Sequence, residues 1–417
     1  MAGTGRIRSA HYNTTIVFIV NDLWHFYERE NKMKLMHLGD LHLGKSLGEF
    51  SLIEDQKYIL KQVLGIIDKE SVDAVLIAGD VYDRTVPSEA ATKLLDDFLN
   101  SLASKNVKTF IISGNHDSDD RLNFGSRLFE SSRIYISAVY DGHLCKHVIN
   151  DADTEVNIYL LPFVKASQVR HYFPESDIGT YDDAVSLIID NAKIDTEKIN
   201  VLVAHQFVAG KGEDPVLGGS ESAGVQSVGL VEKIRYKVFD KFDYVALGHI
   251  HSPQRVGRDE VRYSGSLLKY SLSEVNNEKS VPIITVNGKN DINIRLIPLK
   301  PMHDMRHIKG KMNELLCREN IKAADDFIYA TLTDEEFIND AMGIFQQTYP
   351  NTVKIDYDNS HTRKTEQIDI SKIAQNRSFS ELISDFYRLM YNCDISEEEM
   401  DIMRMTAREA GVIDEAD

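Results

Sequence analysis

The sequence predicts an α/β protein. Between Met33 and about Lys300, apolar runs typical of buried strands alternate with amphipathic helical patterns such as "LIEDQKYILKQVLGIIDKE" and "SEAATKLLDDFLNSLASK". Five of the apolar runs also end in the same kinds of polar residue. With 417 residues and 42% hydrophobic content, the chain is long enough for more than one domain and for sizeable cores.

The first 32 residues precede this pattern. They contain "TTIVFIVNDLW", a short apolar segment that continues into "HFYEREN" without a small-residue cleavage site, so they make a poor signal peptide. Residues 1–32 are either an extension, or a misassigned start, or a genuine extra strand or helix packed on the core.

The polar ends of the five apolar runs carry groups that bind metals. "KLMHLGDLHLGK" presents Asp40 and His42 at spacing i, i+2, so that both can point to one side of an extended segment. One such ending arises easily by chance, but five at the same topological position indicate a composite metal site. The candidate ligands are Asp40, His42, Asp80, Asn115, His205, His249 and His251.

The types of ligand narrow the chemistry. Carboxylate, imidazole and amide oxygen suit manganese, iron or zinc, whereas a structural zinc site would use thiolates. The three cysteines, Cys145, Cys317 and Cys393, lie away from these strand ends. Seven ligands are too many for one ion but suit two ions with a bridging carboxylate. Such a pair activates a water for phosphoester hydrolysis.

One stretch, "TFIISGNHDSDD", also fits an ordinary solvated turn, because Gly-Asn is a common turn dipeptide. The four other strand ends favour the functional interpretation. We expect Gly114 to allow the sharp turn, and Asp117 to brace the turn or a ligand.

The motifs resemble a known superfamily. The series Asp-x-His, Gly-Asp-x-x-Asp-Arg, Gly-Asn-His-Asp, a lone His and Gly-His-x-His is similar to the calcineurin-like metallophosphoesterases. The stretches "HLGDLHLGKSL", "AGDVYDRTVPSEAA", "AHQFVAGK", "YVALGHIHSPQ" and "YSGSLLKYSLSE" resemble the SbcD family, the nuclease subunits of bacterial SbcCD complexes. The resemblance extends from Met33 to the C-terminus. It implies a sandwich of two β-sheets flanked by helices.

The resemblance also implies a role for each candidate residue. One metal ion is expected at Asp40, His42, Asp80 and His251, and the other at Asp80, Asn115, His205 and His249, with Asp80 as the bridge. His116 is expected to face the scissile phosphate and to protonate or stabilise the leaving oxygen. The Asp83 carboxylate is expected to bond His116. Arg84 either meets phosphate or is a solvated surface residue.

The later part of the chain predicts further strands and then smaller units. We expect a turn at Asn287–Gly288 between two strands of a nuclease domain that spans residues 33–300. Residues 301–361 read as helix, strand, helix, strand, and resemble the SbcD capping domain; an ordinary α/β appendage is the alternative. A polar linker is expected over residues 362–377.

Residues 378–417 predict a helical hairpin. Capping-box patterns, Ser378 to Glu381 and Ser396 to Glu399, begin two helices. The first places Phe379, Leu382, Ile383, Phe386 and Leu389 at helical spacing, and the second carries Ile402, Met403 and Met405. The resemblance implies that this hairpin binds the coiled coil of an SbcC-type ATPase. The alternative is packing on the chain's own nuclease domain.

The net charge limits the ways in which the chain can bind nucleic acid. A formal charge of −18 argues against a generally basic DNA-gripping surface, so a partner is expected to provide much of the phosphate binding. No stretch of about 18 apolar residues exists, so no membrane association is expected.

The few cysteines and the lack of an export signal predict that the protein is located in the cytoplasm.

Together these observations predict a nuclease that uses two divalent ions, with Mn²⁺ as the expected metal. By resemblance it is a 3′→5′ double-strand exonuclease and a single-strand and hairpin endonuclease in DNA repair, acting on DNA as a homodimer within a heterotetramer-like assembly with an SbcC-type ATPase. The alternatives are a phosphatase or nucleotidase of the same superfamily, and an inactive scaffold; the intact ligand set argues against the scaffold.

Overall fold

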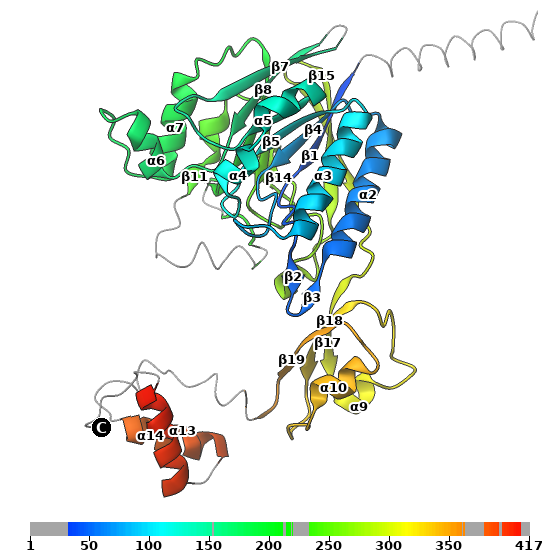
Figure 1. Cartoon of the computed structure of the whole chain (residues 1–417), viewed down its shortest axis with the longest axis vertical. Helices are drawn as coiled ribbons and strands as arrows, with labels where there is room; N and C mark the ends of the chain where they lie inside the picture. Colours follow the sequence, from blue (N-terminus) through cyan, green and yellow to red (C-terminus); the bar gives the residue numbers. More distant parts are fainter. Residues whose placement is uncertain are drawn as a thin grey trace, which may run out of the picture. The chain divides into compact units, whose positions relative to one another are not determined.

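The computed structural model describes residues 32–151, 154–211, 214–217, 219, 233–360, 362, 379–391 and 394–409. The chain forms two compact units, Met1–Asp304 and Met305–Asp417, which are taken separately below (Figure 1). The N-terminal segment before Lys32, nearly all of the predicted linker and the capping box at Ser378 lie outside the described residues.

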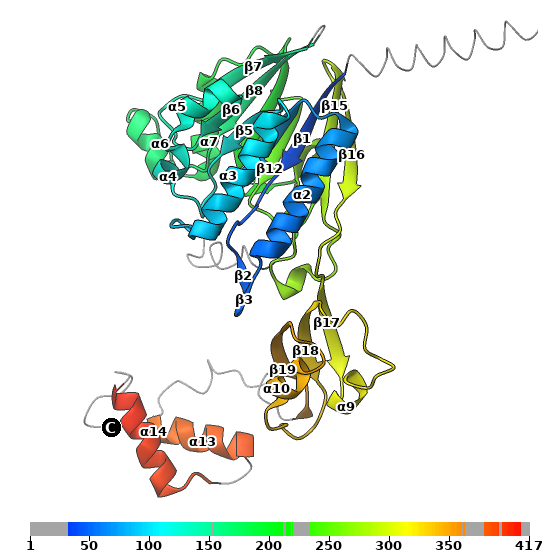
Figure 2. The ribbon, with the colours of Figure 1, turned by 45° about the vertical axis from the view of Figure 1, so that its right-hand side comes forward.

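A six-stranded sheet forms one layer of the first unit, in the order β16-β15-β1-β4-β5-β6. Its strands are β1 (Met33–Leu38), β4 (Ala74–Ala78), β5 (Lys108–Ile112), β6 (Ile134–Ser137), β15 (Ser280–Gly288) and β16 (Asp291–Pro298). The first four are parallel, and β15 and β16 add an antiparallel edge. Helices α2 (Ile53–Glu70) and α3 (Glu89–Ser104) lie side by side on one face (Figures 1 and 2).

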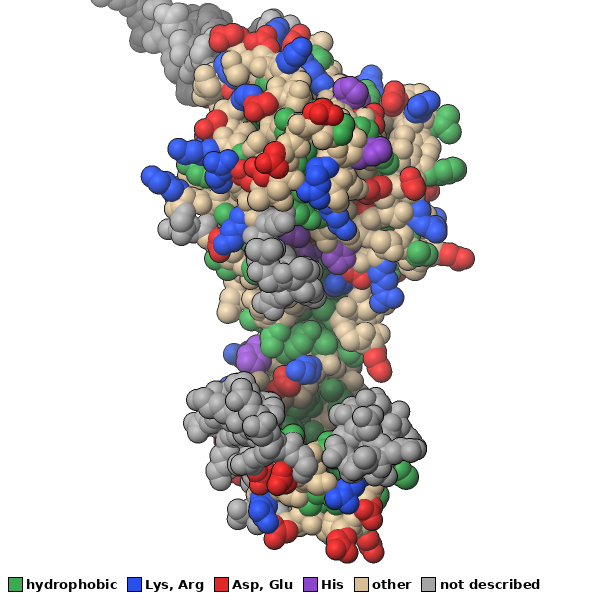
Figure 3. Space-filling view, turned by 90° about the vertical axis from the view of Figure 1, so that its left-hand side faces the viewer, with side chains coloured by type: hydrophobic (Ala, Val, Ile, Leu, Met, Phe, Trp, Pro, Cys, Tyr) green, Lys and Arg blue, Asp and Glu red, His purple; other side chains and the backbone are tan. Residues whose placement is uncertain are grey.

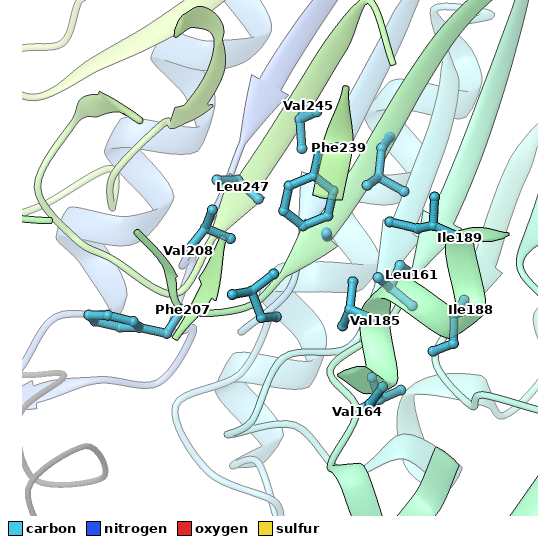
Figure 4. Packing of buried hydrophobic residues seen from close by; sticks show 14 of the residues in the cluster. Leu161, Val164, Val185, Ile188, Ile189, Phe207, Val208, Phe239, Val245 and Leu247 are labelled. Carbon is cyan, nitrogen blue, oxygen red and sulfur yellow. The ribbon is translucent and has the colours of Figure 1, made fainter. Parts of the chain in front are cut away.

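A second six-stranded sheet has the order β13-β14-β12-β9-β8-β7. Its strands are β7 (Cys145–Asn150), β8 (Glu155–Leu161), β9 (Ile199–His205), β12 (Tyr244–Gly248), β13 (Gln254–Val256) and β14 (Arg258–Tyr263). Helices α6 (Ala166–Tyr172) and α7 (Tyr181–Asn191) cover one face. There Val185 and Ile189 of α7 pack with Leu161 and Val245 of the sheet (Figure 4).

The other face of the second sheet packs on the first sheet. Leu76 of β4 and Phe110 of β5 share one buried cluster with Val201 and Val203 of β9 and Ala246 of β12. Central strands are therefore covered on both faces, which explains their continuous apolar runs. The predicted two-sheet sandwich between helices is confirmed.

Most predicted elements of this unit form where expected, with one shift. Ser88 caps α3, since its hydroxyl accepts a hydrogen bond from the Ala91 N–H at 3.2 Å. The turn predicted at Asn287–Gly288 is wrong: Gly288 still pairs with Asp291, and the loop is Lys289–Asn290. Asn290 tolerates the left-handed backbone needed there (φ 60°), and both loop residues bond the Asp243 carboxylate.

Shorter elements complete the first unit. They are β2 (Ser46–Leu47), β3 (Phe50–Ser51), α4 (Asp119–Asn123), α5 (Ser126–Phe129), η1 (Glu130–Ser132), β10 (Val208–Ala209), β11 (Ile234–Arg235), η2 (Tyr236–Phe239) and η3 (Leu272–Glu274).

The second unit contains a parallel sheet in the order β17-β18-β19. Its elements are β17 (Met305–Gly310), α9 (Met312–Leu315), β18 (Phe327–Leu332), α10 (Ala341–Gln346) and β19 (Thr352–Tyr357). Ile328, Leu332 and Phe345 form its core. The predicted helix, strand, helix, strand order is confirmed. β17 was not predicted, because "MRHIKG" is an edge strand with charged residues and only a weak strand pattern.

The two predicted C-terminal helices form as α13 (Phe379–Tyr391) and α14 (Glu397–Glu409). The Arg404 guanidinium of α14 donates to the Ser380 hydroxyl of α13 at 2.8 Å. The capping box at Ser396 is confirmed by its reciprocal bonds with Glu399. Among the described residues, no helix is both long and apolar enough to cross a membrane.

Candidate metal centre

Strand ends from both sheets converge at one edge of the sandwich. β1 leads into Asp40 and His42, β4 into Asp80, and β5 into Asn115; β9 ends at His205, and β12 leads into His249 and His251. Parallel pairing aligns their carboxyl ends, for example Gly248 opposite His205. All seven predicted ligands are therefore brought together. Histidine side chains (purple) are visible on this unit in Figure 3.

Four of the seven residues adopt backbone angles that side chains disfavour. The φ angles are 52° at Asp40, 43° at His42, 47° at Asp80 and 99° at His249. Positive φ is uncommon outside glycine and costs about 1–3 kcal/mol where it is strained. Such conformations persist only where the surrounding fold holds them in place, and they cluster at functional sites.

In the first half of the site, two imidazoles approach each other through their Nε2 atoms. His42 Nε2 lies 3.0 Å from His251 Nε2. The Nδ1 atoms point the other way, 3.6 Å from the Asp83 carboxylate in His42 and 3.4 Å from Glu274 in His251. Ionised carboxylates only accept hydrogen bonds, so Glu274 favours a proton on His251 Nδ1, and the more distant Asp83 charge favours the same tautomer of His42. The two Nε2 lone pairs then face each other, an arrangement that a cation between them would stabilise.

The second half repeats this pattern. His205 Nδ1 donates to the Ala78 carbonyl at 2.8 Å, which leaves Nε2 directed at the site. That Nε2 lies 3.1 Å from Asn115 Oδ1 and 3.4 Å from Asp80 Oδ2, and both of these atoms are acceptors. His249 Nδ1 approaches Asn115 Oδ1 at 2.9 Å. Atoms that can bind a metal therefore converge here as well.

Asp80 lies between the two halves. Its Oδ2 is 3.5 Å from His42 Nε2 and 3.4 Å from His205 Nε2, while its Oδ1 accepts from the His116 N–H at 2.8 Å. One carboxylate oxygen thus faces both groups of donors, as the predicted bridge requires.

The buried charges of the site call for positive charge. Asp40 and Asp80 are both buried, and within the described residues Asp40 Oδ2 has no hydrogen-bond partner. Burial, with the nearby Asp80 charge, raises the pKa of Asp40 to about 6. Burial also opposes ionisation of Asp80, but the neighbouring His205 holds its pKa well below the usual range. Two divalent cations fit this donor set and would neutralise both carboxylates.

His116 differs from expectation in one contact. We expected the Asp83 carboxylate to bond it, but His116 Nδ1 donates to the Asp83 main-chain carbonyl at 3.1 Å. The Asp83 carboxylate instead accepts a hydrogen bond from Lys45 Nζ at 2.8 Å and lies near the His42 ring. The positive charge of Lys45 attracts the carboxylate away from His116. The Arg84 side chain is 82% exposed, which leaves both of its predicted roles open.

Asp117 braces the turn that carries Asn115, as predicted. Its carboxylate accepts from the N–H groups of Val81, Tyr82 and Gly114 at 3.1, 2.9 and 2.9 Å.

The reason for glycine at position 114 is different from the predicted one. A Cβ there would lie 2.2 Å from Asp80 Oδ1, so the site needs the space rather than the backbone freedom.

Sequence reasoning missed a buried group that supports the first half. Glu274 lies beside His251, and Lys279 Nζ bonds Glu274 at 2.6 Å. The Tyr270 ring lies edge-on to His42 and His251, with its hydroxyl bonded to the Leu41 carbonyl. Tyr270, Glu274 and Lys279 belong to the stretch from "SGSLLKYSLSE" to Lys279. A Glu and a Lys among apolar and small residues were the only feature of this stretch that could have indicated a buried ion pair.

The chain matches two family descriptions. Residues 33–253 match the calcineurin-like phosphoesterases, and residues 301–391 match the type 5 capsule protein repressor C-terminal domain, abbreviated SbcD_C. It is also 33% identical over 378 residues to the SbcD subunit of the SbcCD nuclease from Staphylococcus epidermidis. That alignment covers 88% of this chain and 96% of the relative.

Solved structures show more distant likenesses. A dimetal phosphatase from Danio rerio aligns with 65% of this chain and 100% of its own, at 11% identity and a TM-score of 0.34. The Thermus thermophilus sulfate thiohydrolase SoxB aligns with 65% of this chain and 58% of its own, at 12% identity and a TM-score of 0.32. Scores this low support no functional argument.

Proposed function

Since the chain belongs to the SbcD family of calcineurin-like phosphoesterases, we propose that the strand-end cluster is its dinuclear nuclease site. The chain is a metal-dependent nuclease that works with an SbcC-type ATPase on DNA. One observation carries the assignment of the site: in both halves, side-chain atoms that can bind a metal lie 3.0 to 3.1 Å apart, and a cation between them is the simplest group to stabilise them.

Each half of the cluster has a proposed ion. Asp40, His42, Asp80 and His251 would hold one, and Asp80, Asn115, His205 and His249 the other. When bound, two divalent ions supply a nucleophile from water at neutral pH and stabilise the charge of a phosphodiester in displacement. Imidazole-rich ligands favour transition metals over Ca²⁺ and Mg²⁺, and Mn²⁺ is the ion that we propose from the resemblance to the family.

The chain's own residues then handle protons and position. His116 Nδ1 is held by the Asp83 carbonyl, so its Nε2 is the nitrogen left to face the leaving oxygen. The Asp83 carboxylate does not face the substrate itself; it lies 3.6 Å from His42 Nδ1, where its charge favours a proton on Nδ1 and leaves Nε2 for the site. This replaces the predicted bond from the Asp83 carboxylate to His116.

The chain is proposed to form a homodimer, and the homodimer to form a heterotetramer-like assembly with the ATPase. Phe124, which directly follows α4, is 83% exposed, and Leu128 of α5 is 78% exposed. Large apolar side chains this exposed and this close in sequence are typical of a contact surface. A second copy of the chain is the occupant we propose, and it would place two nuclease sites in one assembly.

The proposed division of the chain follows the predicted ranges: nuclease domain 33–300, capping domain 301–361, linker 362–377 and partner-binding helices 378–417. The match of residues 301–391 to the SbcD_C description supports a separate unit after the nuclease domain. The cytoplasmic location, the 3′→5′ polarity and the hairpin activity come from the family.

The proposal is tested by incubating the purified chain with labelled linear duplex, hairpin DNA and a generic phosphomonoester, with Mn²⁺ or Mg²⁺, with and without the ATPase. We expect cleavage of both DNA substrates. Turnover of the monoester alone would support a phosphatase or nucleotidase, and no turnover of any substrate would support a scaffold.

The choice of metal gives a first prediction. The nuclease should be far more active with Mn²⁺ than with Ca²⁺, because Ca²⁺ prefers six to eight oxygen ligands and this site offers four imidazoles. Initial rates on one labelled duplex, measured across a titration of each ion after chelator treatment, check this. Equal rates in the two metals would contradict the proposed ligand sets.

The C-terminal helices give a second prediction. Deleting residues 378–417 should abolish co-purification with the ATPase while leaving metal content and cleavage of short substrates nearly unchanged, because Phe386, Ile402 and Met405 are exposed and unused by the metal site.

Point variants separate docking from folding in that experiment. Phe386→Asp should weaken co-purification, whereas Glu398→Ala, an exposed polar change on α14, should not. Loss of metal or solubility in the deletion would show instead that the helices belong to the nuclease core.

A further inference from the structure

A buried ion pair lies behind one of the proposed ligands. After β14, the chain turns at η3 and brings Glu274 within 3.4 Å of His251 Nδ1. The other carboxylate oxygen accepts from Lys279 Nζ at 2.6 Å. The side chains of Lys279 and Glu274 are 4% and 0% exposed, so both charges are withdrawn from water.

Lys279 holds the ligand as well as the carboxylate. Its Nζ also donates to the His251 carbonyl at 2.9 Å and lies 2.8 Å from the Ser266 hydroxyl. Glu274 further accepts from the Tyr270 N–H at 3.2 Å and the Ser271 hydroxyl at 3.1 Å. The main chain and the ring of His251 are thus held by one polar network whose members are nearly all buried.

Such a pair contributes little to stability by itself. Removing two charges from water is unfavourable, and replacing a buried pair by apolar residues is often neutral or stabilising. Its geometry, however, has a specific consequence for His251. A carboxylate at Nδ1 keeps the proton there, which leaves the Nε2 lone pair directed at the site.

We propose that Glu274, held by Lys279, is a positioning residue that fixes the tautomer and ring orientation of His251 for binding a divalent ion. This inference rests on the proposed metal site. It adds that the affinity for one of the two ions depends on a residue outside the seven ligands. The Asp83 carboxylate lies 3.6 Å from Nδ1 of His42, so each imidazole of this half has a carboxylate near its Nδ1.

The chain offers a matched control for the test. Asp243 is also a buried carboxylate, bonded by Lys289 Nζ and by the Asn200 N–H, each at 2.8 Å. It lies just before β12, whereas His249 and His251 lie just after that strand. Glu274→Gln and Asp243→Asn therefore make the same chemical change, the first beside a proposed ligand and the second at the other end of β12.

The experiment measures Mn²⁺ binding to the metal-free full-length chain by calorimetric titration, with thermal melting in parallel. In Glu274→Gln, one of the two ions should bind about 10–100-fold more weakly, the usual effect of losing such a partner, and the other should be unchanged. Excess Mn²⁺ should restore much of the lost DNA cleavage. Asp243→Asn should bind both ions like the wild type even if its melting temperature falls.

A double variant, Glu274→Gln with Lys279→Gln, removes both charges of the pair together and carries the same expectation if Glu274→Gln alone does not fold. The inference is overturned if either variant binds both ions with wild-type affinity, or if Asp243→Asn loses as much affinity. A wild-type chain that binds fewer than two ions or cleaves no DNA would instead overturn the proposed function, which makes the two failures distinguishable.

Discussion

His116→Gln is expected to lower the turnover of DNA about 10²–10⁴-fold, the usual contribution of a positioned general acid, while both metal ions and DNA affinity are retained. The reason is that His116 lies outside both proposed ligand sets. Its Nδ1 is bonded to the Asp83 carbonyl, and its N–H bonds Asp80 through the main chain, which glutamine preserves.

Asn115→Ala is the matched comparison, because the two residues are neighbours with different proposed roles. Asn115 Oδ1 lies between His205 Nε2 and His249 Nδ1, so its loss should weaken one ion, and excess Mn²⁺ should partly restore activity by mass action. Metal stoichiometry and cleavage rate across a Mn²⁺ titration check both variants. If His116→Gln loses an ion or is rescued as well as Asn115→Ala, then His116 is a ligand and the proposed division of roles is wrong.

Gly248→Ala is expected to disrupt the site and destabilise the fold by about 3 kcal/mol, near the upper end of the range for overpacking. An added Cβ would lie 1.9 Å from the Ala78 carbonyl oxygen of the other sheet and 2.8 Å from His205 Nδ1. It would therefore push β12 away from β4 and break the bond between His205 and Ala78, and one ion should be lost as a result.

A control variant separates this close approach from the general effect of replacing glycine. Gly65 lies in α2, and a Cβ there would meet nothing within 4 Å, so Gly65→Ala should be stabilising by up to about 1 kcal/mol. Urea unfolding and Mn²⁺ titration of both variants check the prediction. Wild-type stability and metal binding in Gly248→Ala would show that the sheets can separate without disturbing the site.

Local features of the sequence were enough to predict the seven candidate ligands and the layered fold. Each ligand follows an apolar run, and parallel strands place their carboxyl ends at one edge, so positions such as Asp80 and His205 could be assigned without coordinates. Helices α2 and α3 were equally readable, since apolar spacing and the Ser88 cap are properties of neighbouring residues.

The tertiary structure alone decided which groups support those ligands. Glu274 reaches His251 across 23 positions, Asp83 turns its carboxylate to Lys45 and His42 instead of His116, and Gly248 meets Ala78 of the other sheet. These contacts depend on how two sheets approach each other and on how loops cross their edge. Strand and helix periodicity report burial along one element, whereas the partner of a buried polar group is set by elements distant in sequence, which no local pattern encodes.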